Sequence, residues 1–189
     1  MHPLPLTLPE KLVDGDLVLQ APRLIDAEPH CRAEDDELRR RFDSRRPATV
    51  EETRSAFQRW IDGWEAGAPT RTYLAWLGAE LVGGVELRRT RLERGEMSWW
   101  TYAAHRRGGF ATRAARLLCG AAAGVDGLSE LHAHIDPDNV ASRRVAERLG
   151  FVEDGMVDDI AWDGVVDTRV LYTRPVWATP RTAQLSPAS

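Results

Sequence analysis

The sequence is poor in cysteine and has no long apolar run. Its two cysteines, Cys31 and Cys119, lie far apart and lack CxxC spacing, which argues against a disulfide framework or a zinc ribbon. No stretch of about 18 apolar residues occurs, and the first residues contain neither a basic segment nor a continuous apolar one. We therefore expect a cytoplasmic protein that does not contact a membrane.

The charge balance argues against a nucleic-acid-binding protein. The 189 residues include 25 Lys and Arg and 29 Asp and Glu, so the net charge is −4, and this balance provides no general attraction for a phosphate backbone. Lys11 is the only lysine. Arginine suits bidentate phosphate contacts, although a GC-rich genome is the simpler explanation of the bias. We expect no nucleic-acid partner.

Length and composition predict one globular domain. With 43% hydrophobic and 29% charged residues, a chain of this size can bury one sizeable core. Proline and leucine alternate in residues 1–13, which we expect to form a loosely held, flexible arm. Residues 14–177 are expected to form the domain, and residues 178–189 a disordered tail.

Hydrophobic periodicity and turn residues predict alternating strands and helices. The pattern indicates an α/β (α+β) fold with a mixed, mostly antiparallel sheet of about seven strands, helices on both faces and a C-terminal β-hairpin turning at Asp163-Gly164. Strands are expected over 17–20, 72–77, 81–87, 96–102, 131–135, 152–162 and 165–172, and helices from 25, from 49–51, over 110–123 and from 139 to 149.

The stretch from Glu96 to Thr112 has the pattern of a phosphate site. An aromatic strand leads through Arg106-Arg107 and Gly108-Gly109 into a helix that starts at Phe110. The first turn of a helix has free N–H groups and a partial positive charge, which favour an anion. The stretch lacks the Gly-Lys-Ser/Thr ending of a P-loop and the GxGxxG of a dinucleotide fold.

Four segments, taken in order, resemble a known family. Arg106 to Ala111 reads Arg-x-x-Gly-x-Ala, and Asn139 to Phe151 contains Asn-x-x-Ser and ends in Gly-Phe. With Asp16 to Leu19 and the aromatic Glu96 to Trp100, they resemble the GCN5-related N-acetyltransferase (GNAT) superfamily, closest to its ribosomal-protein N-terminal acetyltransferase (RimJ/RimL-like) branch, over about residues 16–175. The resemblance implies the GNAT fold, acetyl-CoA as co-substrate, no metal and an amine-bearing acceptor.

The resemblance also implies which residues bind CoA. The aromatic strand would separate from the next strand near residues 100–102, and its free N–H groups would bind pantetheine and polarise the acetyl carbonyl. Asn139 would serve both as a helix N-cap and as a pantetheine contact. The expected CoA-binding residues are Trp100, Thr101, Tyr102, Arg106, Arg107, Gly108, Gly109, Phe110, Ala111, Thr112, Asn139 and Ser142.

The chain departs from the family pattern at two positions. Arg107 stands where the branch usually has glycine, and Ala146 stands where many GNATs have the tyrosine that protonates the leaving thiolate. The first departure affects the local turn of the loop. The second removes an acid from its usual place.

Three residues are candidate catalytic groups. Glu96 is a candidate base, acting through water, or else a strand carboxylate paired with an arginine. Ser142 is a candidate acid by resemblance, or a small polar residue in a first helical turn. Tyr172 is a competing acid, because a phenol with a pKa of about 10 suits a thiolate, or else a packing residue. His132 and His134 share one strand face, as a metal pair or as core histidines.

The leading hypothesis is an N-acetyltransferase in which a primary amine attacks the thioester directly through a tetrahedral intermediate. A protein N-terminal α-amine, with a pKa of about 7.7 to 8.0, is easier to deprotonate than a lysine-like amine at about 10.4; a small-molecule amine remains an alternative acceptor. Another acyl group such as succinyl would require a cation, for example from Arg39 to Arg46. A catalytically silent acyl-CoA-binding module is the third reading, and a homodimer is possible.

Overall fold

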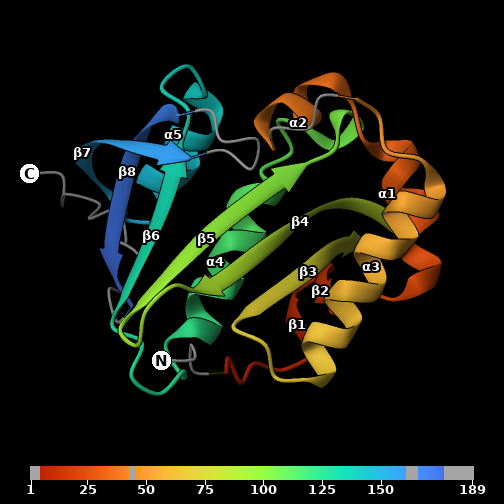
Figure 1. Ribbon diagram of the computed structural model, residues 1–189, viewed down its shortest axis with the longest axis horizontal. Helices are drawn as coiled ribbons and strands as arrows, with labels where there is room; N and C mark the ends of the chain where they lie inside the picture. Colours follow the sequence, from red (N-terminus) through yellow and green to blue (C-terminus); the bar gives the residue numbers. More distant parts are fainter. Residues whose placement is uncertain (1–4, 43–45, 161–165, 177–189) are drawn as a thin grey trace, which may run out of the picture.

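One eight-stranded sheet runs through the molecule in the computed structural model, which describes residues 5–42, 46–160 and 166–176 (Figure 1). The strand order is β1-β2-β3-β4-β5-β6-β8-β7, and only the β5–β6 pair is parallel. The predicted mixed, mostly antiparallel sheet is confirmed. The strands are β1 (Lys11–Asp14), β2 (Leu17–Gln20), β3 (Thr70–Leu77), β4 (Glu80–Arg89), β5 (Arg94–Thr101), β6 (Glu130–Ile135), β7 (Val152–Ile160) and β8 (Val166–Pro175).

Helices cover both faces of the sheet, as predicted. The helix expected from residue 25 is divided into a 3-10 turn and two short helices, because Glu34 adopts an extended conformation. None of the helices in the described ranges is long and apolar enough to cross a membrane. The helical segments are η1 (Leu24–Asp26), α1 (Ala27–Ala33), α2 (Asp36–Arg41), α3 (Val50–Glu65), η2 (Ala103–His105), α4 (Phe110–Ala122) and α5 (Val140–Arg148).

Alternation along the strands divides the core between the two faces. Tyr73 and Ala75 of β3 belong to the larger cluster, which includes the small residues of α4, whereas Leu74 packs with Phe57 of α3. Figure 1 shows α1 and α3 on the near face and α4 behind the sheet. The alanines of α4 therefore serve the packing that their pattern predicted.

The N-terminal segment corrects one expectation. Leu6 is completely buried, the Tyr73 hydroxyl donates a 2.6 Å hydrogen bond to the Pro9 carbonyl, and Lys11–Asp14 pairs with β2. Residues 5–13 are thus packed rather than loosely held, and β1 is the strand that raises the expected seven to eight. Residues 1–4, the turn at Asp163-Gly164 and the expected tail over 178–189 lie outside the described residues.

Strands β5 and β6 part soon after they meet. Their parallel pairing covers only Arg94 to Glu96 against Glu130 to His132, while β5 stays paired with β4 as far as Thr101. The separation therefore begins earlier than the expected 100–102. The Tyr102 N–H donates a hydrogen bond to the Val82 carbonyl of β4. Backbone groups alternate in direction along a strand, so those of Met97, Trp99 and Thr101 point away from β4 and into the gap.

Two glycines of β4 make room for the end of β5. A Cβ on Gly84 would lie 2.1 Å from the Trp100 indole, so we expect Gly84→Ala to lower the free energy of unfolding by about 1 to 3 kcal/mol. Gly120 in α4 has open space around it, and Gly120→Ala should raise stability by about 0.5 to 1 kcal/mol. Urea unfolding of both variants checks this; equal stability of Gly84→Ala and the parent would contradict it.

Candidate functional site

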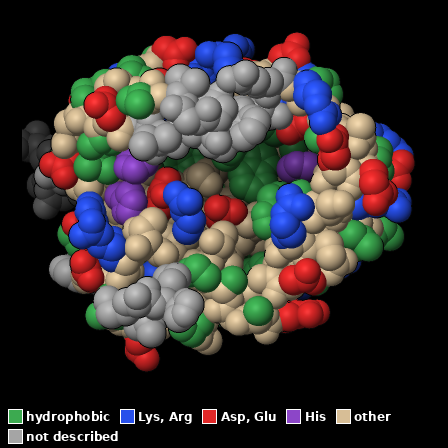
Figure 2. Space-filling view, in the orientation of Figure 1, with side chains coloured by type: hydrophobic (Ala, Val, Ile, Leu, Met, Phe, Trp, Pro, Cys, Tyr) green, Lys and Arg blue, Asp and Glu red, His purple; other side chains and the backbone are tan. Residues whose placement is uncertain are grey.

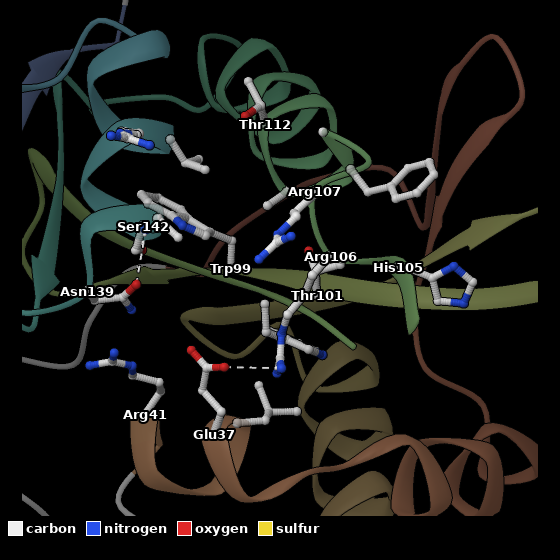
Figure 3. Close-up of a pocket in the computed structure, with 18 of the residues that line it drawn as sticks. Glu37, Arg41, Trp99, Thr101, His105, Arg106, Arg107, Thr112, Asn139 and Ser142 are labelled. Carbon is white, nitrogen blue, oxygen red and sulfur yellow. Dashed lines mark hydrogen bonds and ion pairs between the residues drawn. The ribbon is translucent and has the colours of Figure 1, made fainter. Parts of the chain in front are cut away.

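A cavity of about 590 Å³ opens where β5 ends (Figure 3). It lies between α2, the loop before α4, and α5, so three segments distant in sequence form its walls. Its lining consists of Glu37, Leu38, Arg41, Phe42, Trp99, Trp100, Thr101, His105, Arg106, Arg107, Gly109, Phe110, Ala111, Thr112, Asn139, Ala141, Ser142, Arg144, Val145 and Arg148.

Most of the expected CoA-binding residues line this cavity. Tyr102 and Gly108 do not. Tyr102 is buried beneath the site, and Gly108 supports the loop, since a Cβ there would lie 2.5 Å from the Phe110 ring. The structure thus gathers the loop, the helix start and the first turn of α5 around one space.

The loop before α4 turns through two left-handed residues. Arg107 has φ 67° and Gly109 has φ 77°, and Arg107 is the only non-glycine residue with positive φ among those described. The chain therefore keeps a conformation that glycine favours at a position occupied by arginine. Gly109 is the N-cap of α4 and supplies no capping side chain, so the first-turn N–H groups remain open to the cavity.

The two loop arginines have different surroundings. Arg106 Nη1 lies 2.7 Å from Asp35 Oδ2 and 3.1 Å from Glu37 Oε2, and its hydrogen bond to Asp35 lowers the pKa of that carboxyl. Arg107 points into the cavity in Figure 3 and has no hydrogen bond or ion pair with any described residue. Arg107 is therefore the loop cation that an incoming anion can reach without displacing a carboxylate.

Helix α2 is held on both sides of the cavity. Besides the contacts of Arg106 with Asp35 and Glu37, Arg41 Nη1 lies 2.7 Å from Asp136 Oδ2 and 2.6 Å from Asp138 Oδ1. These ion pairs connect the basic cluster of α2 to the segment between β6 and α5. The basic cluster is visible in the sequence, but no pattern of neighbouring residues indicates which carboxylates it contacts.

The start of α5 combines a cap with the cavity wall. Asn139 Oδ1 accepts a 3.1 Å hydrogen bond from Ser142 N–H, so the predicted N-cap is confirmed. Asn139 and Ser142 both line the cavity, and their ligand roles stay predictions. Ala146 is completely buried in the core. Arg144 and Arg148, which sequence reasoning missed, lie one turn apart on α5 and add two cations to the same wall.

A second cavity of about 80 Å³ lies in the gap between β5 and β6. Five residues line both cavities, so the two spaces adjoin. Trp99 is one of them, and its indole N–H is buried without a partner among the described residues. The shared residues are Arg41, Phe42, Trp99, Asn139 and Ser142.

The three candidate catalytic residues are not all together. Glu96 and Ser142 line the second cavity. Glu96 forms an ion pair with Arg88, and its Oε1 lies 3.7 Å from His134 Nδ1, so the arginine partner considered from sequence is present. Tyr172 lines neither cavity: its buried hydroxyl accepts a 3.0 Å hydrogen bond from Arg143 Nε.

A buried histidine supports the wall behind Trp100. His30 Nδ1 and the Tyr102 hydroxyl are 2.7 Å apart, and edge-to-face contacts surround the imidazole with Phe57, Trp60 and Trp100. Burial lowers the pKa of His30 to about 4. The imidazole is therefore neutral at physiological pH. It packs against the aromatic rings and forms one hydrogen bond with Tyr102.

Comparisons with known proteins agree on one family. Residues 16–152 match the family described as acetyltransferase (GNAT) domain. Similar solved structures include the RimL ribosomal L7/L12 alpha-N-protein acetyltransferase in complex with coenzyme A (18% identity, TM-score 0.73, covering 88% of this chain and 98% of that one). Mycobacterium smegmatis RimJ in complex with CoA-disulfide is 20% identical (TM-score 0.69, covering 93% and 90%).

A third similar structure is the microcin C7 self-immunity acetyltransferase MccE with acetyl-CoA and AMP (18% identity, TM-score 0.73, covering 86% and 93%). At these identities the solved structures establish the fold alone, and the predicted GNAT fold is confirmed. No curated protein sequence matches the chain.

Glycine at position 107 should remove the backbone strain of the loop. A left-handed conformation costs a non-glycine residue about 1 to 2 kcal/mol, partly offset by the greater freedom of glycine in the unfolded chain. We expect Arg107→Gly to raise the unfolding free energy by about 0.5 to 1 kcal/mol in ligand-free protein. Arg106→Gly, which removes the ion pairs of Arg106 at a residue with φ −61°, should lower it. Destabilisation by Arg107→Gly in urea unfolding would contradict the prediction.

His30 should make the fold sensitive to mild acid. Its folded-state pKa lies below its unfolded value of about 6.5, so only the unfolded chain gains a proton as the pH falls, and stability decreases from pH 6.5 towards pH 4. We expect this to cost about 2 to 3 kcal/mol by pH 4. Urea unfolding across this range should show a smaller loss in His30→Gln. Parallel curves for parent and variant would rule out this origin.

Proposed function

We propose, from the premise that the chain belongs to the acetyltransferase (GNAT) domain family, that it transfers acetyl from acetyl-CoA to a primary amine. The observation that carries the proposal is the gap between β5 and β6, which adjoins the glycine-rich start of α4. A thioester in this gap would meet the free backbone edge of β5.

The ligand-free loop suits the phosphates of CoA. The first turn of α4 presents open N–H groups, Arg107 adds a guanidinium that has no ion pair with the described residues, and both face the cavity. Strain at Arg107 supports a functional position, because such conformations concentrate where a ligand is bound. Arg106 would instead hold α2 through Asp35 and Glu37.

The edge of β5 suits the pantetheine and acetyl groups. Met97, Trp99 and Thr101 turn backbone groups into the gap, and the buried Trp99 indole N–H lacks a partner among the described residues. Donors already fixed in place stabilise the oxyanion of a tetrahedral intermediate. The amine nitrogen would bond to the carbonyl carbon, the C–S bond would then break, and the CoA thiolate would take a proton.

Ser142 is the acid that the cavities support better than Tyr172. It lines both cavities, whereas Tyr172 lines neither and its hydroxyl accepts a hydrogen bond from Arg143. Ser142 Oγ would donate a proton to sulfur, directly or through water, and would regain one from the amine nitrogen, which loses a proton as it becomes an amide. Acceptors with a low amine pKa, such as a protein N-terminus, need the least help in losing their proton.

The other acyl groups and the silent module have less support. In the part of the cluster that is described, Arg40 and Arg41 are paired with Asp136 and Asp138, so a succinyl carboxylate would have to displace a carboxylate. The silent module rests on Ala146, but Glu96 and Ser142 lie together at the gap. Acetyl transfer is therefore the function to test first.

Binding of acetyl-CoA tests the assignment of the loop. Isothermal titration should detect acetyl-CoA, and Arg107→Gly should weaken it about tenfold, as expected for one lost charged contact. Gly109→Trp should also weaken binding, although a Cβ there meets nothing within 4 Å in the free protein. Unchanged affinity in both variants would show that the phosphates bind elsewhere, and no binding by the parent would reject the proposal.

Turnover separates an enzyme from a binding module. Thiol release from acetyl-CoA should be measured with peptides bearing free N-termini, polyamines and aminoglycosides, with succinyl-CoA as the alternative donor. We expect release with acetyl-CoA and a peptide N-terminus, and at least a tenfold loss in Ser142→Ala. Tight binding with no turnover across this panel would support the silent module instead.

A further inference from the structure

We propose that His134 is the base that takes the proton from the acceptor amine, and that Glu96 is a positioning residue that stabilises the protonated imidazole. This rests on the proposed function, because it assigns a role at the same gap. It changes the sequence-based role of Glu96 and gives one to a histidine that sequence reasoning left without a function.

The parting of the strands places His134 at the opening. His132 is the last residue of β6 paired with β5, and His134 follows two residues later on the same face, where the strands have separated. His134 lines the second cavity together with Ser98 and Ser142, whereas His132 does not. Figure 2 shows histidine side chains over β6 at the edge of a hollow in the face drawn in Figure 1.

The partners of Glu96 make it a poor base and a good support. Its carboxylate is shared between Arg88 and His134, whose Nδ1 lies 3.7 Å from Oε1. Both carboxylate oxygens are therefore engaged, Oε2 with Arg88 and Oε1 with His134. A neutral imidazole, with a reference pKa of about 6.5, is better matched to an amine near neutral pH than a carboxylate of about 4.3.

The proton balance follows from this arrangement. An acceptor ammonium would pass one proton to the imidazole and become the neutral nucleophile, and the resulting imidazolium would lie beside the Glu96 carboxylate. The proton would then leave to solvent before the next turnover.

Charged and titratable groups from each neighbouring element lie around this imidazole. Glu96 is one ion-pair partner of the ring, and both cations and anions lie around the gap. The charged and titratable groups are Glu130, His132 and, beyond the strand end, Asp136 on β6; Glu96 and Arg94 on β5; Arg88 on β4; Arg169 on β8; and Arg41 on α2.

The first experiment needs no acceptor. Ring signals of the histidines in the full chain, saturated with CoA, are followed by NMR from pH 5 to 8.5. We expect His134 to titrate within this range, and Glu96→Gln to move its midpoint to lower pH because an adjacent anion is lost. A His134 ring that stays neutral throughout, or whose midpoint does not move in Glu96→Gln, would overturn the proposal.

The second experiment uses the best amine of the acceptor panel. His134→Asn should lower kcat about 100-fold or more and remove the acidic limb of the rate profile, with the KM for acetyl-CoA unchanged. Glu96→Gln should lower kcat less and move that limb to lower pH. His132→Asn is the matched control, since its ring centroid is 5.4 Å from that of His134 but it lines neither cavity; its kcat should stay within about threefold.

Two results separate the possible failures. If Glu96→Gln loses the rate and its acidic limb while His134→Asn stays within about threefold of the parent, Glu96 is the base and the inference is wrong although the proposed function stands. If the parent does not bind acetyl-CoA, the proposed function itself fails. Calorimetric CoA binding by each variant shows that its fold and donor site are intact.

Discussion

The site depends on where the pairing between β5 and β6 stops. Only three residue pairs join these strands, while β5 follows β4 as far as Thr101 and β6 follows β8 over its full length. Each strand therefore belongs to a different half of the sheet beyond Glu96. A sheet interrupted in this way exposes unpaired backbone donors on an inner edge. Such donors need a hydrogen-bond partner, which in other sheets is a neighbouring strand or water.

Charge holds the surrounding elements in place. Helix α2 has only six residues and is too short to be stable alone, yet Arg106 holds it on one side and Asp136 and Asp138 hold Arg41 on the other. Partly buried ion pairs with several contacts contribute more to the stability of the fold than isolated surface pairs do. The carboxylates in these pairs engage arginines that the composition alone would count as available to bind phosphate.

Two adjacent arginines of the loop before α4 have different surroundings. Arg107 adopts a left-handed conformation, which favours glycine, at a position where the family pattern usually has glycine. Its side chain enters the cavity because the backbone is turned that way, and Arg106, directed to α2, pairs with acids. The different surroundings of these adjacent arginines follow from backbone direction, which residue type does not reveal.

Features that depend on neighbours within a few residues were determined by the sequence itself: the glycine-rich helix start at Gly109, the Asn139 cap and the alternation that splits the core at Tyr73 and Leu74. Their hydrogen bonds and periodicities are local, so spacing suffices to predict them. Only the tertiary structure decided the packing of Leu6, the pairing of Glu96 with Arg88 and His134, and the removal of Tyr172 from the gap. Those outcomes depend on strand register and on contacts between residues distant in sequence, for which a single sequence carries no spacing rule.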